Sequence, residues 1–143
     1  MTRTVFRSGG GFEDVAAYSR AVRVGGRIVT SGTAALDSKG VALHPGDVEA
    51  QTRGAIEVAV AAVEALGGSI KDVTRTRIYL SAGVDWRGSV VAHRQAFAEI
   101  NPANTTVYVH ALIPEGALVE VELEAEVDDQ QTGDTNQTGA NDE

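Results

Sequence analysis

Four glutamates alternate with apolar residues near the end of the chain, and carboxylates in such a row can serve as acids, bases or ion-pair partners. In an extended strand, side chains alternate between the two faces. The apolar face would hold Val119, Val121, Leu123, Ala125 and Val127. The acidic face would hold Glu120, Glu122, Glu124 and Glu126. Neighbouring carboxylates on such a face lie about 7 Å apart, so nearby cations must offset their repulsion.

Two arginines are the natural partners for these carboxylates. Arg75 and Arg77 fall on the polar face of a strand predicted over residues 73–80, where cross-strand pairing with acids is favourable. For Glu122, Glu124 and Glu126 we therefore expect ordinary ion pairs on a solvated face, which need no function.

The other residues with reactive side chains give weaker patterns. Cysteine is absent, which excludes disulfides, thiolate zinc sites and cysteine nucleophiles. The three histidines, at positions 44, 93 and 110, lack the spacing of metal ligands. His93 lies on the apolar face of a predicted helix and is expected to be a buried, hydrogen-bonded residue rather than a base. No metal or other cofactor is predicted, and a triad of Ser31 or Ser89 with His93 and Asp85 lacks a supporting motif.

Gly9-Gly10-Gly11 does not have the context of a phosphate-binding loop. No helix is predicted to begin there, and no Lys-Ser/Thr pair follows. We expect a flexible turn.

Charge and composition exclude several classes of protein. The formal net charge is −8, and residues 128–143 hold five acidic residues and no basic one. That segment has no large apolar side chain, so we predict a folded domain over residues 1–127 and a disordered acidic tail over 128–143. All twelve basic residues precede position 95, and this acidic balance argues against nucleic-acid binding. No apolar stretch resembles a secretory signal or a membrane span, so we predict a cytoplasmic protein without a membrane partner.

Periodicity predicts the elements that would position these residues. Gly25-Gly26 joins two short β-branched runs as a hairpin, after a short strand at about residues 4–7. Helical spacing follows from Asp47 to Leu66, with Asp47 as the N-cap and Gly67-Gly68 as the end. A second helix is predicted from Trp86 to Ile100, capped by Asp85 and ended by Asn101-Pro102. Its apolar face would comprise Trp86, Val90, His93, Phe97 and Ile100.

With strands predicted over residues 73–80, 105–111 and 118–127, this order indicates an α+β domain. Two helices would cover one face of a single mixed sheet. The other face would remain uncovered by the chain itself, which favours oligomerisation.

Several local strings, in this order and spacing, resemble the RidA/YjgF family over about residues 14–127. They are Tyr18–Val22, Ile28–Gly32, Ala65–Ser69, Asp72–Leu80, Pro102–Val107 and Gly116–Glu122. The resemblance implies a chorismate-mutase-like fold and a homotrimer with small-molecule clefts between subunits. It also implies the activity of the family's best-known branch, which is hydrolysis of enamine or imine acids such as 2-aminoacrylate to 2-oxo acids and ammonia.

The resemblance also suggests roles for single residues. Glu120 matches the glutamate that positions or activates water, and is the predicted catalytic residue. Tyr18, Ser31 and Thr105 match positions that line the cleft. Asn104, however, stands where that branch has an arginine that grips the substrate carboxylate. A neutral amide lacks the charge and the bidentate fork of arginine, so weak or absent 2-aminoacrylate deaminase activity is expected unless Arg20, Arg77 or Arg94 takes that place.

Two hypotheses follow. In the first, the protein is an atypical enamine/imine hydrolase (deaminase) for a small carbonyl- or imine-type molecule without an α-carboxylate. In the second, it is a non-catalytic small-molecule-binding or regulatory trimer. The endoribonuclease activity often attributed to the family fits the acidic balance poorly.

Overall fold

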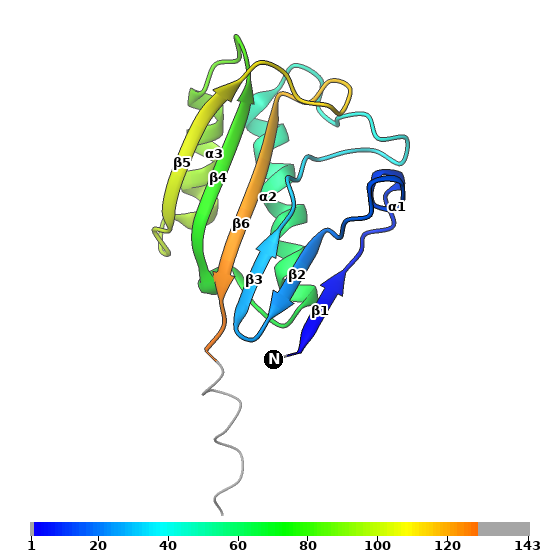
Figure 1. The fold of residues 1–143 in the computed structure, drawn as a ribbon. Coiled ribbons are helices and arrows are strands. Elements are labelled where there is room, and N and C mark those ends of the chain that lie inside the picture. The colour runs from blue at the N-terminus through cyan, green and yellow to red at the C-terminus, as the bar shows by residue number, and fades with distance from the viewer. Residues whose placement is uncertain (1, 129–143) are drawn as a thin grey trace, which may run out of the picture.

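A computed structural model describes residues 2–128 of the chain (Figure 1). The predicted acidic tail lies outside the described residues, apart from Asp128. In chain order the elements are β1 (Arg3–Phe6), α1 (Gly11–Ala16), β2 (Ala21–Val24), β3 (Arg27–Thr30), α2 (Val48–Ala65), the 3-10 turn η1 (Ile70–Asp72), β4 (Val73–Ser81), α3 (Arg87–Phe97), β5 (Ala103–Val109) and β6 (Val119–Glu126).

The six strands form one mixed sheet in the order β1-β2-β3-β6-β4-β5. Among the strands of residues 2–128, only the β4–β5 pair is parallel, and α3 provides the crossover between these two strands. Helices α2 and α3 pack side by side behind the sheet (Figure 1). The predicted α+β fold, with two main helices on one face of a single mixed sheet, is confirmed.

The long helix α2 follows its sequence signals closely. The Asp47 side chain accepts a hydrogen bond from the Ala50 amide at 3.0 Å, which caps the first turn. At the other end, Gly67 adopts a φ of +89° and Gly68 donates to the Val63 carbonyl, as expected at a glycine C-terminus. The alanines of α2, including Ala55, Ala59 and Ala62, are buried against the sheet.

The second helix differs from its prediction. Helix α3 ends at Phe97 rather than Ile100, and Trp86 and Val90, expected on the buried face, are 45% and 47% exposed. The buried residues are Ser89, Ala92 and Phe97. The reason is the contact with α2: a β-carbon at Gly88 would lie 2.6 Å from Val48 Cγ1, so the helices meet through the smallest side chain available. This close approach turns Gly88, rather than Trp86 or Val90, toward α2.

The glycine-rich segment also differs from its prediction, because a short helix, α1, begins at Gly11. Its first turn is organised by the carboxylate of Glu13, which accepts hydrogen bonds from the amides of Ser8 and Gly10. An acidic side chain that accepts hydrogen bonds from the free amides at the start of a helix stabilises that helix. These bonds explain why an ordered first turn of α1 forms where a flexible turn was expected.

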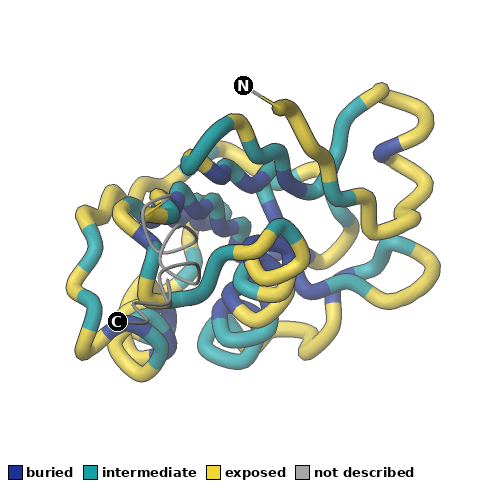
Figure 2. The backbone as a smooth tube through the Cα atoms, turned by 90° about the horizontal axis from the view of Figure 1, so that it is seen from below, coloured by how far each residue is buried: buried dark blue, intermediate teal, exposed yellow. Residues whose placement is uncertain are grey.

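Burial divides the sheet as the alternating pattern predicted. Val119, Val121, Leu123 and Ala125 of β6 are buried under α2, whereas the glutamates between them lie on the open face. Figure 2 shows the buried segments gathered in the interior and the exposed ones on the outer loops and edges. The edge strand β5 is exposed from Ala103 to Tyr108. Strand β5 also begins and ends two residues earlier than predicted, because it pairs with β4 from Arg75 to Ser81.

The predicted cross-strand ion pairs are confirmed on the open face. Arg77 Nη1 lies 3.7 Å from Glu122 Oε2 and 3.3 Å from Glu124 Oε1. Arg75 Nε lies 3.6 Å from Glu124 Oε2, and Arg27 of β3 adds a third contact to Glu124 at 3.4 Å. These cations offset the repulsion within the glutamate row.

Candidate functional site

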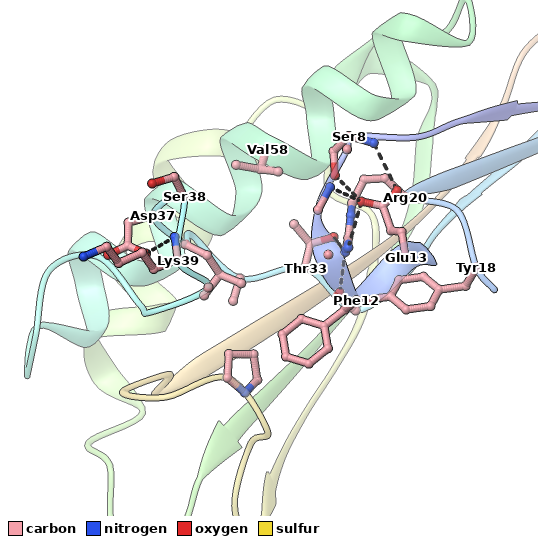
Figure 3. Close-up of a pocket in the computed structure, with 18 of the residues that line it drawn as sticks. Ser8, Phe12, Glu13, Tyr18, Arg20, Thr33, Asp37, Ser38, Lys39 and Val58 are labelled. Atoms are coloured by element: carbon pink, nitrogen blue, oxygen red, sulfur yellow. Dashed lines mark hydrogen bonds and ion pairs between the residues drawn. The ribbon is translucent and has the colours of Figure 1, made fainter. Parts of the chain in front are cut away.

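The main cavity, of about 780 Å³, lies where α1, the segment of residues 32–40 and the start of β6 meet. Its wall combines charged groups (Glu13, Arg20 and Glu120) with apolar side chains. Those apolar residues include Phe12, Leu36, Val58 and Pro114. Figure 3 shows the rings of Phe12 and Tyr18 beside the charged groups, whereas Asp37 and Lys39 lie on the other side of the cavity. A concave site with an apolar body and a few converging polar groups is the common form of a small-molecule site.

Glu120, the predicted catalytic residue, is on this wall. It is the second residue of β6, and its side chain packs on Gly32, where a β-carbon would lie 3.5 Å from Glu120 Oε1. Burial raises the pKa of Glu120, the charge of Arg20 lowers it, and Glu122 raises it further, with a net increase. A carboxyl group with a raised pKa in a cavity is suited to giving and taking a proton during a reaction.

Arg20 lies in the same cavity, immediately before β2. Its Nη1 donates to the Gly32 carbonyl at 2.7 Å and to Thr33 Oγ1 at 3.3 Å. Its Nη2 lies 3.8 Å from Glu13 Oε2, and its guanidinium stands 5.6 Å from the centre of the Tyr18 ring. Figure 3 shows Arg20 and Glu13 pointing toward one another. Of the three arginines considered from the sequence, Arg20 is therefore the one in the cavity with Glu120.

Tyr18, predicted from the family pattern, also lines the cavity. Ser31 lies one residue before Gly32, but its hydroxyl donates to the Ser19 carbonyl at 2.7 Å and is not part of the cavity wall. Ser31 therefore holds the two cavity segments together: its amide also donates to the Arg20 carbonyl at 2.9 Å.

Asn104 and Thr105 lie on the edge strand β5, outside the cavity wall of the single chain. Asn104 Nδ2 donates to Thr76 Oγ1 at 3.0 Å, and Asn104 Oδ1 accepts from Thr106 Oγ1 at 3.0 Å. Thr105 pairs in register with Arg77, on the opposite face of the sheet from Asn104. The structure thus brings Glu120 and Tyr18 together but not Asn104 or Thr105.

These hydrogen bonds continue through the buried Thr76 to His93, which is partly buried. Thr76 Oγ1 lies 2.8 Å from His93 Nε2, and the His93 ring contacts that of Phe97. Burial lowers the pKa of His93, so the neutral ring is favoured. The expected hydrogen bond of His93 is present, whereas its ring is partly rather than fully buried.

The remaining candidates lie elsewhere. Arg77 is on the open face among glutamates, and Arg94 borders a smaller cavity of about 200 Å³ beside His93 and Phe97. Among residues 2–128, no cluster of three or more potential metal ligands is present. Within the same residues, no helix is long and apolar enough to cross a membrane.

Sequence reasoning missed Glu13 as part of the site. Its side chain is 1% exposed, yet its neighbour Asp14 is 77% exposed, and no local pattern distinguishes the two. In the sequence, Gly32 stands out only as the last residue of the Ile28–Gly32 string. Its contact with Glu120 joins residues 88 positions apart, which only the folded sheet brings together.

Comparison with known proteins places this architecture in a family. Residues 11–127 match the family model described as Endoribonuclease L-PSP. An uncharacterised protein of Streptomyces coelicolor is 36% identical over 120 residues, covering 83% of this chain and 88% of that protein. A RutC family protein of Pyrococcus horikoshii is 32% identical over 105 residues, covering 73% and 82%.

Solved structures agree. A crystal structure from Mycobacterium tuberculosis, described as a member of the YjgF/YER057c/UK114 family, is 40% identical and superposes with a TM-score of 0.79, covering 88% of this chain and all of that one. The YjgF gene product of Escherichia coli is 29% identical, with a TM-score of 0.66 over 76% of this chain and 87% of that one. The matched family model, the sequence relatives and the shared fold together show that this chain belongs to the RidA/YjgF/YER057c/UK114 (endoribonuclease L-PSP) family.

Proposed function

We propose that this protein is an atypical enamine/imine hydrolase for a small molecule that lacks an α-carboxylate. The observation that carries the proposal is the Glu120 carboxyl group, which stands in a cavity with its pKa raised by burial. Such a group takes a proton from water as the water oxygen bonds to the imine carbon and the C=N electron pair moves to nitrogen. It then gives this proton to nitrogen, which forms a carbinolamine. Transfer of the hydroxyl proton to nitrogen through the same carboxyl group then lets ammonia leave as the carbonyl forms.

The charges around the cavity support a substrate without a carboxylate. The Arg20 guanidinium already has the buried Glu13 carboxylate as its counter-ion. Lys39 belongs to an exposed turn and lies on the other side of the cavity from Arg20 (Figure 3). A substrate carboxylate in the cavity would therefore lie beside Glu13 and the ionised form of Glu120, which carry charge of the same sign.

Asn104 also supports a substrate that lacks a carboxylate. At the position of an arginine that would bind the substrate carboxylate, the Asn104 amide forms hydrogen bonds with Thr76 and Thr106. Each hydrogen bond to a charged group contributes about 1.5–3 kcal/mol, so loss of a bidentate pair lowers binding or rate by about two to four powers of ten. We therefore expect weak or absent activity on 2-aminoacrylate.

We further propose that the working unit is a cytoplasmic homotrimer. The sheet's open face and the exposed strand β5 support assembly, because both are left uncovered by the chain's own helices. In such an assembly Asn104 and Thr105 of one subunit would complete the cavity of another. Neither a membrane nor nucleic acid is proposed as a partner.

The test compares two substrates made in situ: 2-aminoacrylate and the uncharged imine of the same carbon number, released by an amine oxidase. Ammonia release is followed above the spontaneous rate. The wild type should accelerate hydrolysis of the uncharged imine, and Glu120→Ala should lose that activity. Glu126→Ala, which removes a carboxylate from the exposed end of the same strand face, is the matched control and should keep it.

Three results decide between the alternatives. A gain of 2-aminoacrylate hydrolysis in Asn104→Arg supports the proposed cause of the wild type's weak activity. Wild-type turnover of 2-aminoacrylate as fast as that of the uncharged imine contradicts the proposed substrate class. If no imine is hydrolysed but small carbonyl compounds raise the melting temperature, the protein is a ligand-binding trimer without turnover.

A further inference from the structure

Glu13 is a buried ion at the back of the cavity. Its side chain is 1% exposed and accepts hydrogen bonds from the Ser8 amide at 3.0 Å, the Gly10 amide at 3.2 Å and the Ser8 hydroxyl. Burial by itself would raise the pKa of Glu13, but these donors and the charge of Arg20 outweigh it and lower the pKa. Glu13 is therefore a fixed negative charge at neutral pH.

Arg20 is held between this ion and the cavity floor. One end of its guanidinium faces Glu13 at 3.8 Å, and the other donates to the Gly32 carbonyl at 2.7 Å and to Thr33 Oγ1. Its side chain is only 14% exposed. An arginine with both ends engaged has one orientation, and its charge is partly neutralised by Glu13.

Glu120 packs on the same glycine. Gly32 thus offers its carbonyl to Arg20 and its α-carbon to the Glu120 carboxyl group. The charged groups that act on Glu120 are Arg20, immediately before β2, and Glu122 on β6 itself; on the neighbouring strand β4, Tyr79 pairs with Glu120 in register. Arg20 is the cation of this set.

We propose that Arg20, clamped by Glu13, is a positioning residue that decides how readily Glu120 gives up its proton and so sets the pH range in which the site works. The proposal rests on the proposed function for its meaning, since a proton on Glu120 matters only if the site handles protons. The arrangement also assigns a role to Glu13: it limits how strongly Arg20 stabilises the ionised form of Glu120.

The test is a direct titration of Glu120 in the full-length protein. The side-chain carboxyl carbons of glutamate are labelled with ¹³C, the Glu120 signal is assigned by its loss in Glu120→Gln, and its midpoint is followed against pH by NMR. Arg20→Gln should move the midpoint to higher pH, because a favourable charge is removed. Glu13→Gln should move it to lower pH, because Arg20 then lacks its counter-ion.

Two further variants separate charge from structure. Arg20→Lys keeps the positive charge but loses the planar guanidinium with its paired N–H donors. The Glu120 midpoint in this variant should therefore stay closer to that of the wild type than the midpoint in Arg20→Gln. Arg27→Gln removes the same charge from an exposed arginine that pairs with Glu124, and should leave the Glu120 midpoint in place. If Arg20→Gln does not fold, the opposite shift expected for Glu13→Gln still tests the proposal.

The outcomes are distinct from those of the proposed function. A midpoint that stays unchanged in Arg20→Gln, or moves to lower pH, overturns the role of Arg20 even if imines are hydrolysed. Shifts of opposite sign in the Arg20 and Glu13 variants support it even if no substrate is turned over. Where turnover is measurable, the acid limb of its pH profile should shift with the NMR midpoint.

Discussion

Asn104 and Glu120 lie on opposite faces of the same sheet. Asn104 pairs in register with Thr76, whose side chain is buried on the helix side, whereas Glu120 pairs with Tyr79 on the open side. The two residues are also separated by strand β4 and by three positions along it, about 10 Å in each direction. A small ligand therefore cannot touch both side chains of one chain.

Assembly is the first prediction. The protein should have a mass in solution of three times 14.9 kDa, measured by sedimentation velocity or native mass spectrometry. Val107→Asp, which places a charge on the exposed open-face side of β5, should shift the mass toward one chain, since burying an unpaired charge at an interface is costly. Ile113→Asp, on an exposed loop, is the control and should leave the mass unchanged. A wild-type monomer at micromolar concentration would contradict this prediction.

The raised pKa of Glu120 predicts how stability depends on pH. The folded state binds the Glu120 proton more tightly than the unfolded state, whose pKa is near the ordinary 4.5. Its stabilising contribution is therefore fully present below that pH and is lost as pH rises through the folded pKa. Glu120→Gln should accordingly gain stability relative to the wild type as pH rises, measured by urea unfolding at several pH values. Glu126→Gln is the control for removing a carboxylate from this face. If Glu120→Gln raised the free energy of unfolding by the same amount at every pH, that result would argue against the raised pKa of Glu120.

Glu13 is expected to stabilise the fold with the opposite pH dependence. Glu13→Ala removes the acceptor for Ser8 and Gly10 and leaves Arg20 without its carboxylate, which should cost about 1–3 kcal/mol of unfolding free energy. Because the pKa of Glu13 is lowered by folding, its contribution is present above the ordinary 4.5 and is lost as pH falls. The deficit should thus be largest near neutral pH. Asp14→Ala, at the exposed neighbouring carboxylate, should change stability by no more than about 0.5 kcal/mol.

The contact between α2 and α3 predicts a strict requirement for glycine at position 88. A β-carbon there would lie 2.6 Å from Val48 Cγ1 and 3.1 Å from the Glu49 amide nitrogen, so Gly88→Ala must push the helices apart. Overpacking of this kind costs about 1–3 kcal/mol, measurable by chemical denaturation. Gly11→Ala is the matched control, because a β-carbon at Gly11 has no neighbour within 4 Å. Equal effects of the two substitutions would show that the helix contact is looser than described.

The sequence alone determined the elements whose signals are local. The alternation of β4 and β6 placed Arg75 and Arg77 on the face of the glutamates, and the ion pairs with Glu122 and Glu124 follow from it. Asp47 and Gly67 likewise fixed the ends of α2. These features depend on periods of two or 3.6 residues and on hydrogen bonds between near neighbours, which any folded context preserves.

Only the tertiary structure decided the site. The face of α3 was set by Gly88 meeting Val48, and the side on which Asn104 lies was set by its parallel register with Thr76. In a strand, a shift of one residue in register reverses every side chain, so a local pattern without a buried alternation cannot fix that choice. Glu13, Arg20 and Glu120 lie in segments far apart in the chain, and the folded structure brings them into one cavity. The burial that raises the pKa of Glu120 exists only in that folded structure.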